Sequence, residues 1–511
     1  MPSKEEIARS PNDFNNIGTS LQFSKAQKYF IAIVFAAAIY FPVFYCLDTL
    51  PLSIFDEAHV AVNAIELTWR HFWVTTYNNS PEMWNLKPPL LPWLQRLCMY
   101  VVGYNTLAVR LPSAFAALGC CVMFLIFSRK IFTNYLSGIA ASLVLVTSQG
   151  FIRDHVARNG DYDTLLSFFI LSAFLLFYIY FHTSQKKYLY FAGAALLGGL
   201  LTKGVAAVIF TPGVVIFLIY EKKIGALLKQ KAFWLTALIV LAVITGFYII
   251  RDASTPGYFK KVVEGEWKGI PLTVVQGHSG PWWFYIDYFF NTGFAQYAVV
   301  LLAALVSYIF LPRNTSLHKI AVYCLLFILA QGGILSVTTS KLPWYDAPVY
   351  TVAALLAGIF IAHIIGYFTD LSSGFTARIK PVVICALLLA FFSWPYMRTM
   401  QYILKSQPAN WSALNYEAYL KKLRKDKPDT KNFIIGYASN AEQVLFFGQA
   451  YNKQYNYKIS WKDAWQQFNT GDTIVSCERF TLDTLSRQYN YTLLHKDGDC
   501  TAFVLHNKLT K

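Results

Sequence analysis

The sequence predicts a polytopic α-helical membrane protein that ends in a small α/β soluble domain. Of the 511 residues, 55% are hydrophobic and only 14% are charged, whereas soluble domains carry about 25% charged residues. Aromatic residues make up 17% of the chain, which is typical of a lipid-embedded body with aromatic belts at the membrane interfaces. This composition excludes a conventional cytosolic enzyme, a disordered chain and a disulfide-stapled secreted module.

The chain begins with a polar segment, residues 1–28, which we expect in the cytoplasm. Residues 29–46 form the first apolar segment, which starts too late and runs too long for a signal peptide. Ten further apolar segments of about spanning length follow: residues 111–127, 135–152, 165–181, 189–201, 205–220, 233–250, 295–311, 320–337, 347–367 and 382–394. We therefore predict a transmembrane domain over residues 29–397.

Residues 90–104 decide the topology. The segment is apolar but short and contains Gln95 and Arg96, so it could cross the membrane or lie as an amphipathic helix in the interface. If it is interfacial, five basic loops fall on the side of the N-terminus: residues 129–130, 186–187, 221–231, 313–319 and 378–380. Basic residues accumulate in cytoplasmic loops, so we predict about eleven transmembrane helices, with the N-terminus inside and the C-terminus outside.

The tail, residues 398–511, is charged and polar and contains strand-like runs at 433–437, 473–476 and 501–505. Helical patterns lie between these runs, which predicts an α/β domain outside the membrane. The tail has only two cysteines, Cys477 and Cys500. In an oxidising compartment they could form a disulfide, and the sequence alone leaves the bonded and the free state open.

The net charge of +16 is explained by the basic inner loops and does not indicate nucleic acid as a partner. We expect a monomer surrounded by membrane lipids. With the predicted topology, the unusual polar residues all fall on the outer face: Asp56, Glu57, Lys87, Arg153, Asp154, His155, Arg158, Asp161, Asp163, Lys203, His278, Lys341 and Tyr345. Ionisable residues at such positions are candidates for function.

The chemistry of this set is coherent. Carboxylates can act as a general base, a substrate anchor or a metal ligand, and Lys and Arg bind phosphate as a point charge and as a fork. Together they predict a polyprenyl-phosphate-linked substrate. Each residue alone also has a structural reading: Asp56 and Glu57 could cap a helix, Lys203 and Lys341 could snorkel, Arg158 and Asp163 could form an ion pair, and His278 could belong to an interfacial belt.

Seven short motifs resemble the superfamily of aminoarabinose transferases and protein O-mannosyltransferases, which are membrane glycosyltransferases of the GT-C class. They are Asp56-Glu57, Asn85-Leu86-Lys87-Pro88-Pro89-Leu90, Arg110-Leu111-Pro112-Ser113, Arg158 with Asp163-Thr164-Leu165-Leu166, Thr202-Lys203-Gly204, the run from Gly277 to Tyr285, and Lys341-Leu342-Pro343-Trp344-Tyr345. Their order over residues 55–350 is similar to that of the superfamily. The tail is not covered by the resemblance.

The resemblance implies a GT-C fold with juxtamembrane helices in the first outer loop. It also implies an inverting transfer of a sugar from a polyprenyl-phosphate donor to an acceptor at the periplasmic face of a bacterial inner membrane. It makes Asp56 and Asp163 the catalytic carboxylates, with Asp161 as the competitor of Asp163. The residues that it implies for substrate binding are Glu57, Lys87, Arg158, Lys203, Lys341 and Tyr345.

One departure concerns a metal. In aminoarabinose transferases an acidic residue can precede the Lys-Pro-Pro turn and join a histidine in a metal site, but this chain has Leu86 at that position. His278 is then the one candidate ligand left for a divalent metal ion, and a single histidine makes a poor site.

The favoured function is transfer of the sugar to a lipid or glycan acceptor, such as lipid A. Two alternatives to this function stay open. A protein O-mannosyltransferase shares the acidic pair at Asp56. A transporter or flippase for anionic lipids would also place cations near lipid, although such proteins usually contain two related halves, which this sequence lacks.

Overall fold

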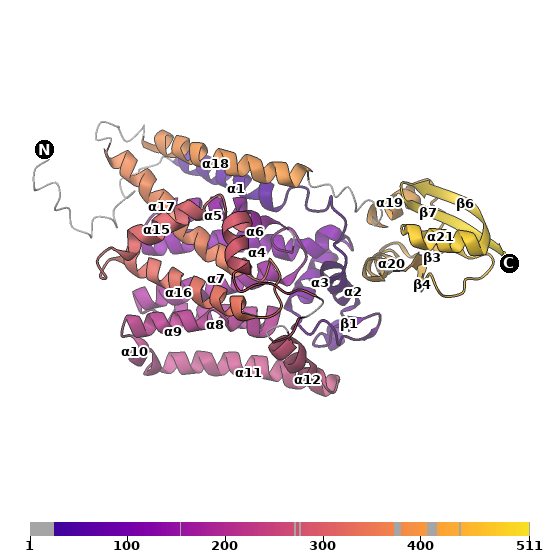
Figure 1. The fold of residues 1–511 in the computed structure, drawn as a ribbon, viewed down its shortest axis with the longest axis horizontal. Coiled ribbons are helices and arrows are strands. Elements are labelled where there is room, and N and C mark those ends of the chain that lie inside the picture. Colours follow the sequence, from indigo (N-terminus) through magenta and orange to yellow (C-terminus); the bar gives the residue numbers. More distant parts are fainter. Residues whose placement is uncertain are drawn as a thin grey trace, which may run out of the picture.

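The computed structural model describes residues 25–509 except for 154, 270–271, 275–276, 372–379, 406–415 and 439–440. It consists of a helical bundle and an α/β domain that lies beyond one end of the bundle (Figure 1). Most of the predicted N-terminal segment, residues 1–24, lies outside the described part of the chain.

Each of the eleven predicted apolar segments contains a helix. These helices are α1 (Lys25–Val43), α4 (Thr106–Ile131), α5 (Leu136–Thr147), α7 (Tyr162–Thr183), α8 (Lys186–Lys203), α9 (Thr211–Tyr220), α11 (Lys231–Ser254), α15 (Ala298–Ile309), α16 (Ser316–Val337), α17 (Ala347–Leu371) and α18 (Lys380–Lys405). They run along the long axis of the molecule (Figure 1).

The predicted number of eleven spans is not confirmed. Among the described residues, seven helices are long and apolar enough to cross a membrane, and there are eight if one pair that bends by 113°, Phe284–Gly293 with Ala298–Ile309, counts as a single span. The helix α5 has 12 residues, which reach about 18 Å, whereas a hydrocarbon core is about 30 Å thick. The polytopic helical architecture itself is as predicted.

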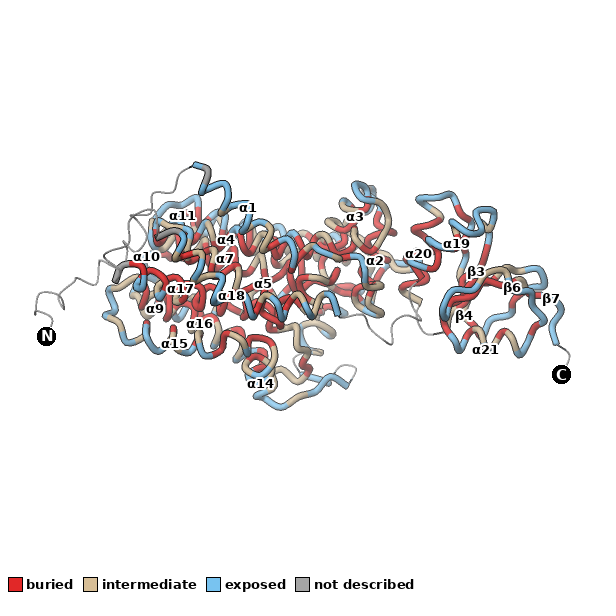
Figure 2. Tube along the Cα trace, turned by 90° about the horizontal axis from the view of Figure 1, so that it is seen from above, coloured by how far each residue is buried: buried red, intermediate tan, exposed pale blue. Residues whose placement is uncertain are grey.

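The helix α17 lies at the centre of the bundle, and 83% of an 18-residue apolar stretch of this helix is buried. It packs closely against α5: a Cβ added at Gly358 would lie 2.3 Å from the Ala141 nitrogen, so only glycine fits at this crossing. The buried residues run along the middle of the bundle (Figure 2). By contrast, only 6% of the corresponding 18-residue stretch of α11 is buried. Its exposed apolar surface suits contact with lipid.

The bundle end next to the α/β domain carries α2 (Asp56–Glu66), the β1–β2 hairpin (Thr76–Tyr77 and Ser80–Pro81), α3 (Leu90–Val102) and α12 (Tyr258–Val262), and α10 (Ile224–Leu228) lies at the opposite end (Figure 1). The predicted juxtamembrane helices are therefore present. The polar residues of α3 face protein: Gln95 donates hydrogen bonds to the Val109 and Gly160 carbonyls, and Arg96 donates one to the Ile65 carbonyl.

The C-terminal domain is built on a sheet of order β4-β3-β5-β7-β6. Its strands are β3 (Asn432–Tyr437), β4 (Lys458–Asp463), β5 (Thr473–Ser476), β6 (Tyr489–Asp497) and β7 (Cys500–Lys508), and its helices are α19 (Tyr416–Asp426), α20 (Ala441–Tyr455) and α21 (Arg479–Gln488). The strands β4, β3 and β5 are parallel to one another. The strand β7 runs antiparallel to both of its neighbours, β5 and β6. The three predicted strand-like runs are thus confirmed, and β4 and β6 were not predicted.

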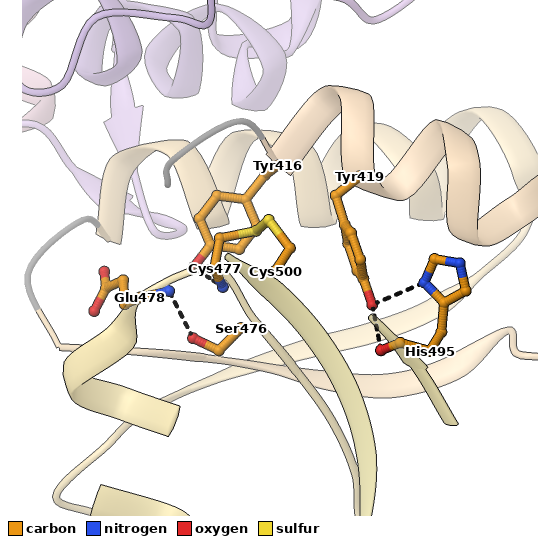
Figure 3. Close-up of a disulfide and its surroundings, with 7 residues drawn as sticks. All are labelled: Tyr416, Tyr419, Ser476, Cys477, Glu478, His495 and Cys500. Carbon is orange, nitrogen blue, oxygen red and sulfur yellow. Dashed lines mark hydrogen bonds between the residues drawn. A yellow bond between two sulfur atoms is a disulfide. The ribbon is translucent and has the colours of Figure 1, made fainter. Parts of the chain in front are cut away.

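Cys477 and Cys500 form a disulfide (Figure 3). Cys477 directly follows β5 and Cys500 begins β7, so the bond joins two neighbouring inner strands where β5 ends. Tyr416, which is fully buried, accepts a hydrogen bond from the Cys477 backbone nitrogen. The bonded state that the sequence left open is the one in the structure.

The C-terminal domain contacts the helix α2. On α20, Gln443 donates a hydrogen bond to the Leu52 carbonyl, Gln449 donates one to the Glu66 carboxylate over 2.5 Å, and Lys453 donates one to the Ile65 carbonyl over 2.5 Å. The domain therefore contacts the C-terminal end of α2 and the loop that precedes the helix.

Candidate functional site

A pocket of about 220 Å³ is lined by ionisable, polar and apolar side chains, among them Asp56 at the start of α2. It is lined by Asp56, Val60, Trp84, Asn85, Leu86, Lys87, Asp161, Tyr162, Asp163, Lys203, Gly265, Glu266, Gly269, His278, Ser340, Leu342, Trp344 and Tyr345. The lining combines segments that are far apart in the chain, and it includes six of the predicted site residues: Asp56, Lys87, Asp163, Lys203, His278 and Tyr345.

Asp56 is the first residue of α2, where the helix dipole favours a negative charge. The preceding residue, Phe55, has a φ of 65°, a conformation that bulky residues rarely adopt, and the chain turns there into the pocket wall. No hydrogen bond or ion pair holds the Asp56 carboxylate within the described residues. Burial and the negative charge of Asp161 raise its pKa.

Glu57 fixes the first turn of α2. It is fully buried and binds the Arg110 guanidinium through both oxygens, over 2.7 and 2.9 Å. The Ser53 and Gly160 backbone nitrogens add hydrogen bonds of 2.6 and 2.7 Å. Although burial raises the pKa of Glu57, Arg110 and these donors outweigh it, so the pKa is lowered. Glu57 therefore lies behind the pocket, where it orients the segment that carries Asp56.

Asp163 and Lys203 form a buried ion pair that joins α7 to the C-terminal end of α8. The Lys203 Nζ lies 2.7 and 2.9 Å from the two Asp163 oxygens. The same ammonium lies 4.8 Å from the centre of the Tyr345 ring, and burial raises the pKa of Tyr345. Both carboxylate oxygens of Asp163 are thus engaged with Lys203, which leaves the ammonium at a defined place in the pocket wall.

Lys87 supplies the second ammonium. Its Nζ lies 3.9 Å from the Glu266 carboxylate and 5.3 Å from the centre of the Tyr162 ring. Burial opposes the charged form, but Glu266 and Asp56 outweigh this effect, and the pKa of Lys87 is raised. Lys87 therefore stays charged at neutral pH.

His155 and Asp161 form a further pair, in which the imidazole Nδ1 lies 3.0 Å from the Asp161 Oδ2. The His155 ring stacks on Trp344 with centroids 3.8 Å apart. Asp161 caps α7, because its Oδ1 accepts a hydrogen bond of 2.7 Å from the Tyr162 nitrogen. Burial raises the pKa of Asp161, but the contact with His155 outweighs it and lowers the pKa to about 2. The same contact outweighs burial at His155 and raises its pKa.

A buried hydrogen-bond network supports the pocket floor. The Glu82 carboxylate contacts the His59 Nε2 over 2.6 Å and accepts hydrogen bonds from Asn63 and the Trp84 nitrogen. Asn85 extends the network by donating to the Asn63 Oδ1 and the Tyr162 hydroxyl. The Oδ1 of Asn85 itself is buried and has no hydrogen-bond partner among the described residues.

Three predicted site residues lie outside the pocket lining: Glu57, Arg158 and Lys341. Arg158 donates hydrogen bonds to the carbonyls of Pro42, Tyr45 and Cys46 at the end of α1. Lys341 is buried and donates to the Thr338 carbonyl. The role of these three in substrate binding stays a prediction.

Several lining residues were missed as site residues at the sequence level. Glu266 lies in the long outer loop and is the fourth carboxylate of the pocket; a charged residue on the predicted outer face was the signal that could have identified it. Asn85 and Trp344 stood inside the quoted motifs without a role. Trp84 and Tyr162 carried no signal that separates them from other interfacial aromatic residues.

The described residues contain one group of three that could hold a metal ion: Asp56, His155 and Asp161, whose ligand atoms lie within 4.8 Å of one another. His278 lines the pocket but belongs to no such group in the described part of the chain. The predicted metal ligand therefore gains no partner ligands, and the carboxylates and His155 are the better donor set.

The arrangement suits group transfer from a phosphate. Two ammonium groups, Lys87 and Lys203, can hold an anionic leaving group whose charge grows during the reaction. In the same pocket, the Asp56 carboxylate, which has no hydrogen bond or ion pair within the described residues, can orient or deprotonate a nucleophile. The pocket lies at the end of a bundle of apolar helices, where a lipid-linked substrate can reach it.

Comparison with known proteins agrees with this geometry. Residues 86–250 match the model of the family described as dolichyl-phosphate-mannose-protein mannosyltransferase. An uncharacterized protein from Aquifex aeolicus (strain VF5) is 25% identical over 283 residues, which cover 54% of this chain and 53% of that protein. An undecaprenyl phosphate-alpha-4-amino-4-deoxy-L-arabinose arabinosyl transferase from Pseudomonas fluorescens (strain Pf0-1) is 24% identical over 366 residues, which cover 68% of this chain and 62% of that protein.

Two crystal structures of ArnT from Cupriavidus metallidurans share the fold. The structure bound to undecaprenyl phosphate has a TM-score of 0.68 at 14% identity and covers 93% of this chain and 97% of that one. The apo structure has a TM-score of 0.65, also at 14% identity, with coverage of 94% and 98%. The GT-C fold and the resemblance indicated by the motifs are therefore confirmed, while the chain spans only about half to three fifths of the length of the two curated relatives.

Proposed function

We propose that this chain, whose fold is that of the GT-C glycosyltransferases, transfers a sugar with inversion from a polyprenyl-phosphate-linked donor to a lipid or glycan acceptor. One observation carries the proposal: the unpaired carboxylate of Asp56 shares one pocket with the ammonium groups of Lys87 and Lys203. The undecaprenyl phosphate in the ArnT crystal structure and the name of the P. fluorescens relative support the same donor class.

In the proposed reaction, Lys87 and Lys203 bind the donor phosphate. Their positions are set before the substrate arrives, since Asp163 holds Lys203 and Glu266 lies beside Lys87. The bond between the anomeric carbon and the phosphate oxygen breaks, and the electron pair goes to the phosphate, whose added negative charge the two ammonium groups stabilise. We assign Asp163 the positioning of Lys203, because both of its oxygens are engaged there.

Asp56 acts on the acceptor. It orients the nucleophilic oxygen, which forms a bond to the anomeric carbon on the face opposite the phosphate, and this attack inverts the configuration. For a hydroxyl acceptor, the proton passes to the Asp56 carboxylate, and its raised pKa favours that transfer. A phosphate acceptor is already anionic and needs orientation alone.

We place the pocket and the C-terminal domain on the periplasmic face of a bacterial inner membrane. The disulfide between Cys477 and Cys500 supports an oxidising compartment for the C-terminal domain. The basic loop around α10 lies at the opposite end of the bundle (Figure 1), which supports a cytoplasmic location for that end.

The acceptor and the sugar are the open parts of the proposal. A protein acceptor is the second candidate, because the family model that matches residues 86–250 describes protein mannosyltransferases. We favour a lipid or glycan acceptor, because the P. fluorescens relative, which matches 68% of this chain, is an aminoarabinose transferase by name. Pentose and hexose donors both remain within the proposal.

The test is deletion of the gene, followed by mass spectrometry of lipid A, surface glycans and glycoproteins. We expect one sugar increment to disappear from one acceptor class, to return with the wild-type gene, and to stay absent with Asp56→Asn at equal protein level. General-base carboxylates contribute about 10²–10⁴-fold. Normal modification with Asp56→Asn would disprove the assignment, and loss of lipid transport with all sugars retained would favour the flippase.

A further inference from the structure

The charge of the pocket is unbalanced. Its lining contains four carboxylates, Asp56, Asp161, Asp163 and Glu266, but only the two ammonium groups of Lys87 and Lys203. Counting carboxylate and ammonium groups alone, the lining has a formal excess of two negative charges, although the proposed function requires the site to receive an anionic phosphate. The expectation of an anionic phosphate rests on the proposed function, whereas the positions of the side chains do not.

Three of the four carboxylates have a cationic or titratable partner: Asp163 binds Lys203 at 2.7 Å, Asp161 contacts His155 at 3.0 Å, and Glu266 lies 3.9 Å from Lys87. Asp56 has no such partner among the described residues, although it is partly buried. The unpaired charge therefore lies at Asp56, next to the pair formed by Asp161 and His155.

The ligand atoms of Asp56, His155 and Asp161 lie within 4.8 Å of one another. Ligands bind a divalent metal at about 2.0–2.2 Å, so two adjacent ligands of one octahedral or tetrahedral ion are about 3.0–3.6 Å apart. The His155 Nδ1 and the Asp161 Oδ2 are 3.0 Å apart, which agrees with adjacent positions on one ion. Asp56 offers a third ligand oxygen from the first residue of α2.

The orientation of these side chains is set by neighbours, as metal ligands generally require. The Asp161 Oδ1 accepts the Tyr162 nitrogen at 2.7 Å, which leaves Oδ2 directed to His155. The His155 ring stacks on Trp344 with an angle of 14° between the planes. A separate observation also indicates a missing partner in this pocket: the Oδ1 of Asn85, which lines it, is buried and accepts no hydrogen bond from the part of the chain that the structure describes.

We propose that Asp56, His155 and Asp161 bind one divalent cation of the transition-metal type. An imidazole nitrogen with two carboxylate oxygens favours Mn²⁺ or Zn²⁺ over Mg²⁺, which prefers oxygen ligands alone. Bound there, the cation cancels the excess charge and supplies a Lewis-acid position for an oxygen of the donor phosphate or the acceptor. The competing arrangement is an ion pair of His155 with Asp161 and no metal.

The test measures Mn²⁺ binding to the full-length protein in detergent, after treatment with a chelator, by the electron paramagnetic resonance signal of free Mn²⁺. We expect one Mn²⁺ per chain, displaced by Zn²⁺, with affinity weakened at least about tenfold in His155→Gln and in Asp161→Asn. His278→Gln is the matched control, since His278 lines the same pocket outside the group of three, and it should bind as wild type.

Asp56→Asn guards against a folding defect, because no hydrogen bond of the described residues depends on the Asp56 carboxylate, and it should also lose the site. Wild-type protein without stoichiometric Mn²⁺ or Zn²⁺ would overturn the proposal, as would His155→Gln and Asp161→Asn variants that are folded and bind normally. This assay contains no sugar donor, so its result does not depend on the proposed function. If the protein binds the metal here but the gene-deletion test shows no loss of sugar transfer, the proposed function is wrong and the metal site still stands.

Discussion

Lys203 and Asp163 form a charged pair with little access to water: 10% of the lysine side chain and 1% of the aspartate side chain are exposed. Removing charges from water costs several kcal/mol per ion, and the partner offsets that cost only while both are present. The pair must therefore hold Lys203 in the pocket wall and stabilise the contact of α7 with α8 at the same time.

We predict that Asp163→Asn and Lys203→Met each lower the free energy of unfolding by about 3–5 kcal/mol, because each leaves one buried charge unpaired. The double variant should recover most of this loss but no transfer activity, since it lacks an ammonium group that we propose to bind the donor phosphate. Thermal and denaturant unfolding in detergent, with a transfer assay, give both readouts. Lys260→Met serves as the control, as Lys260 is 78% exposed. Single variants as stable as wild type would contradict the pair's structural role.

Arg158 illustrates how a residue that is a candidate for substrate binding on the sequence can act on a helix end. Helix ends leave carbonyls without partners, and Arg158 donates to the Pro42, Tyr45 and Cys46 carbonyls over 3.0, 2.8 and 3.0 Å. Arg158 thus joins the end of α1 to the loop before α7. The sequence does not show which backbone carbonyls a side chain will contact. The spacing of the motif alone therefore favoured a role for Arg158 in the pocket.

Because Arg158 holds the end of α1, we predict that Arg158→Gln lowers the free energy of unfolding by about 2–3 kcal/mol, in line with the loss of charge-assisted hydrogen bonds. The KM for the donor should stay unchanged in the folded fraction, and Arg158→Lys should restore part of the stability. A raised KM with unchanged stability would instead assign Arg158 to the substrate. Unfolding curves and donor titration on the same preparations separate the two outcomes.

The β1–β2 hairpin and α2 are joined by Glu82, which is 3% exposed. Burial raises the pKa of Glu82, but His59 and the surrounding donors outweigh it, so that the pKa falls from 4.5 to about 2. A carboxylate with a lowered pKa in the folded state stabilises the protein above its unfolded pKa, near pH 4.5, and loses this contribution as the pH falls toward about 2.

We therefore expect stability to fall by about 3 kcal/mol between pH 5 and pH 2 on account of Glu82, at 1.36 kcal/mol per pKa unit. Glu82→Gln should be less stable than wild type at pH 7, with a difference that shrinks as the pH is lowered. Unfolding at pH 7, 5 and 3 in detergent measures this. A difference between the two proteins that is independent of pH would contradict the assignment.

For the molecule as a whole, hydropathy was sufficient to locate the helices but not to count the spans. The apolar run at residues 135–152 hides the break after Thr147, where α5 ends before α6 (Gln149–Ile152). The run at 205–220 hides the 3₁₀ turn Gly204–Val208 that precedes α9. Apolar composition continues through such breaks because both flanking pieces lie in the same environment, so only backbone geometry reveals them.

The site followed from the sequence in part, for a similar reason. Lys203 and Lys87 interrupt or flank apolar runs, and ionisable residues in such places are rare unless they are functional. Pairings across the fold carry no sequence signal: Asp163 meets Lys203 from 40 residues away, and Glu266 approaches Lys87 from a loop without a motif. Residue type predicted the chemistry of the pocket, whereas the partners depend on the packing of α7, α8 and the outer loops.

The orientation of the whole molecule gives the last prediction. The helices α2 and α3 and the C-terminal domain lie at one end of the bundle, and α10, which follows the basic turn with Lys222 and Lys223, lies at the other (Figure 1). Asp56, the first residue of α2, lines the pocket. Basic loops stay in the cytoplasm, and the Cys477–Cys500 disulfide requires oxidation. From both arguments we predict that the C-terminus lies in the periplasm.

Alkaline phosphatase, which is active only after export, should therefore be active when fused behind residue 511 and inactive when fused into the α9–α10 turn. Green fluorescent protein at the same two positions should give the opposite pattern, which controls for expression. On non-reducing gels the wild-type chain should change mobility upon reduction, and Cys477→Ser should not. Inactive phosphatase at the C-terminus would place the pocket in the cytoplasm, where a periplasmic acceptor could not reach it.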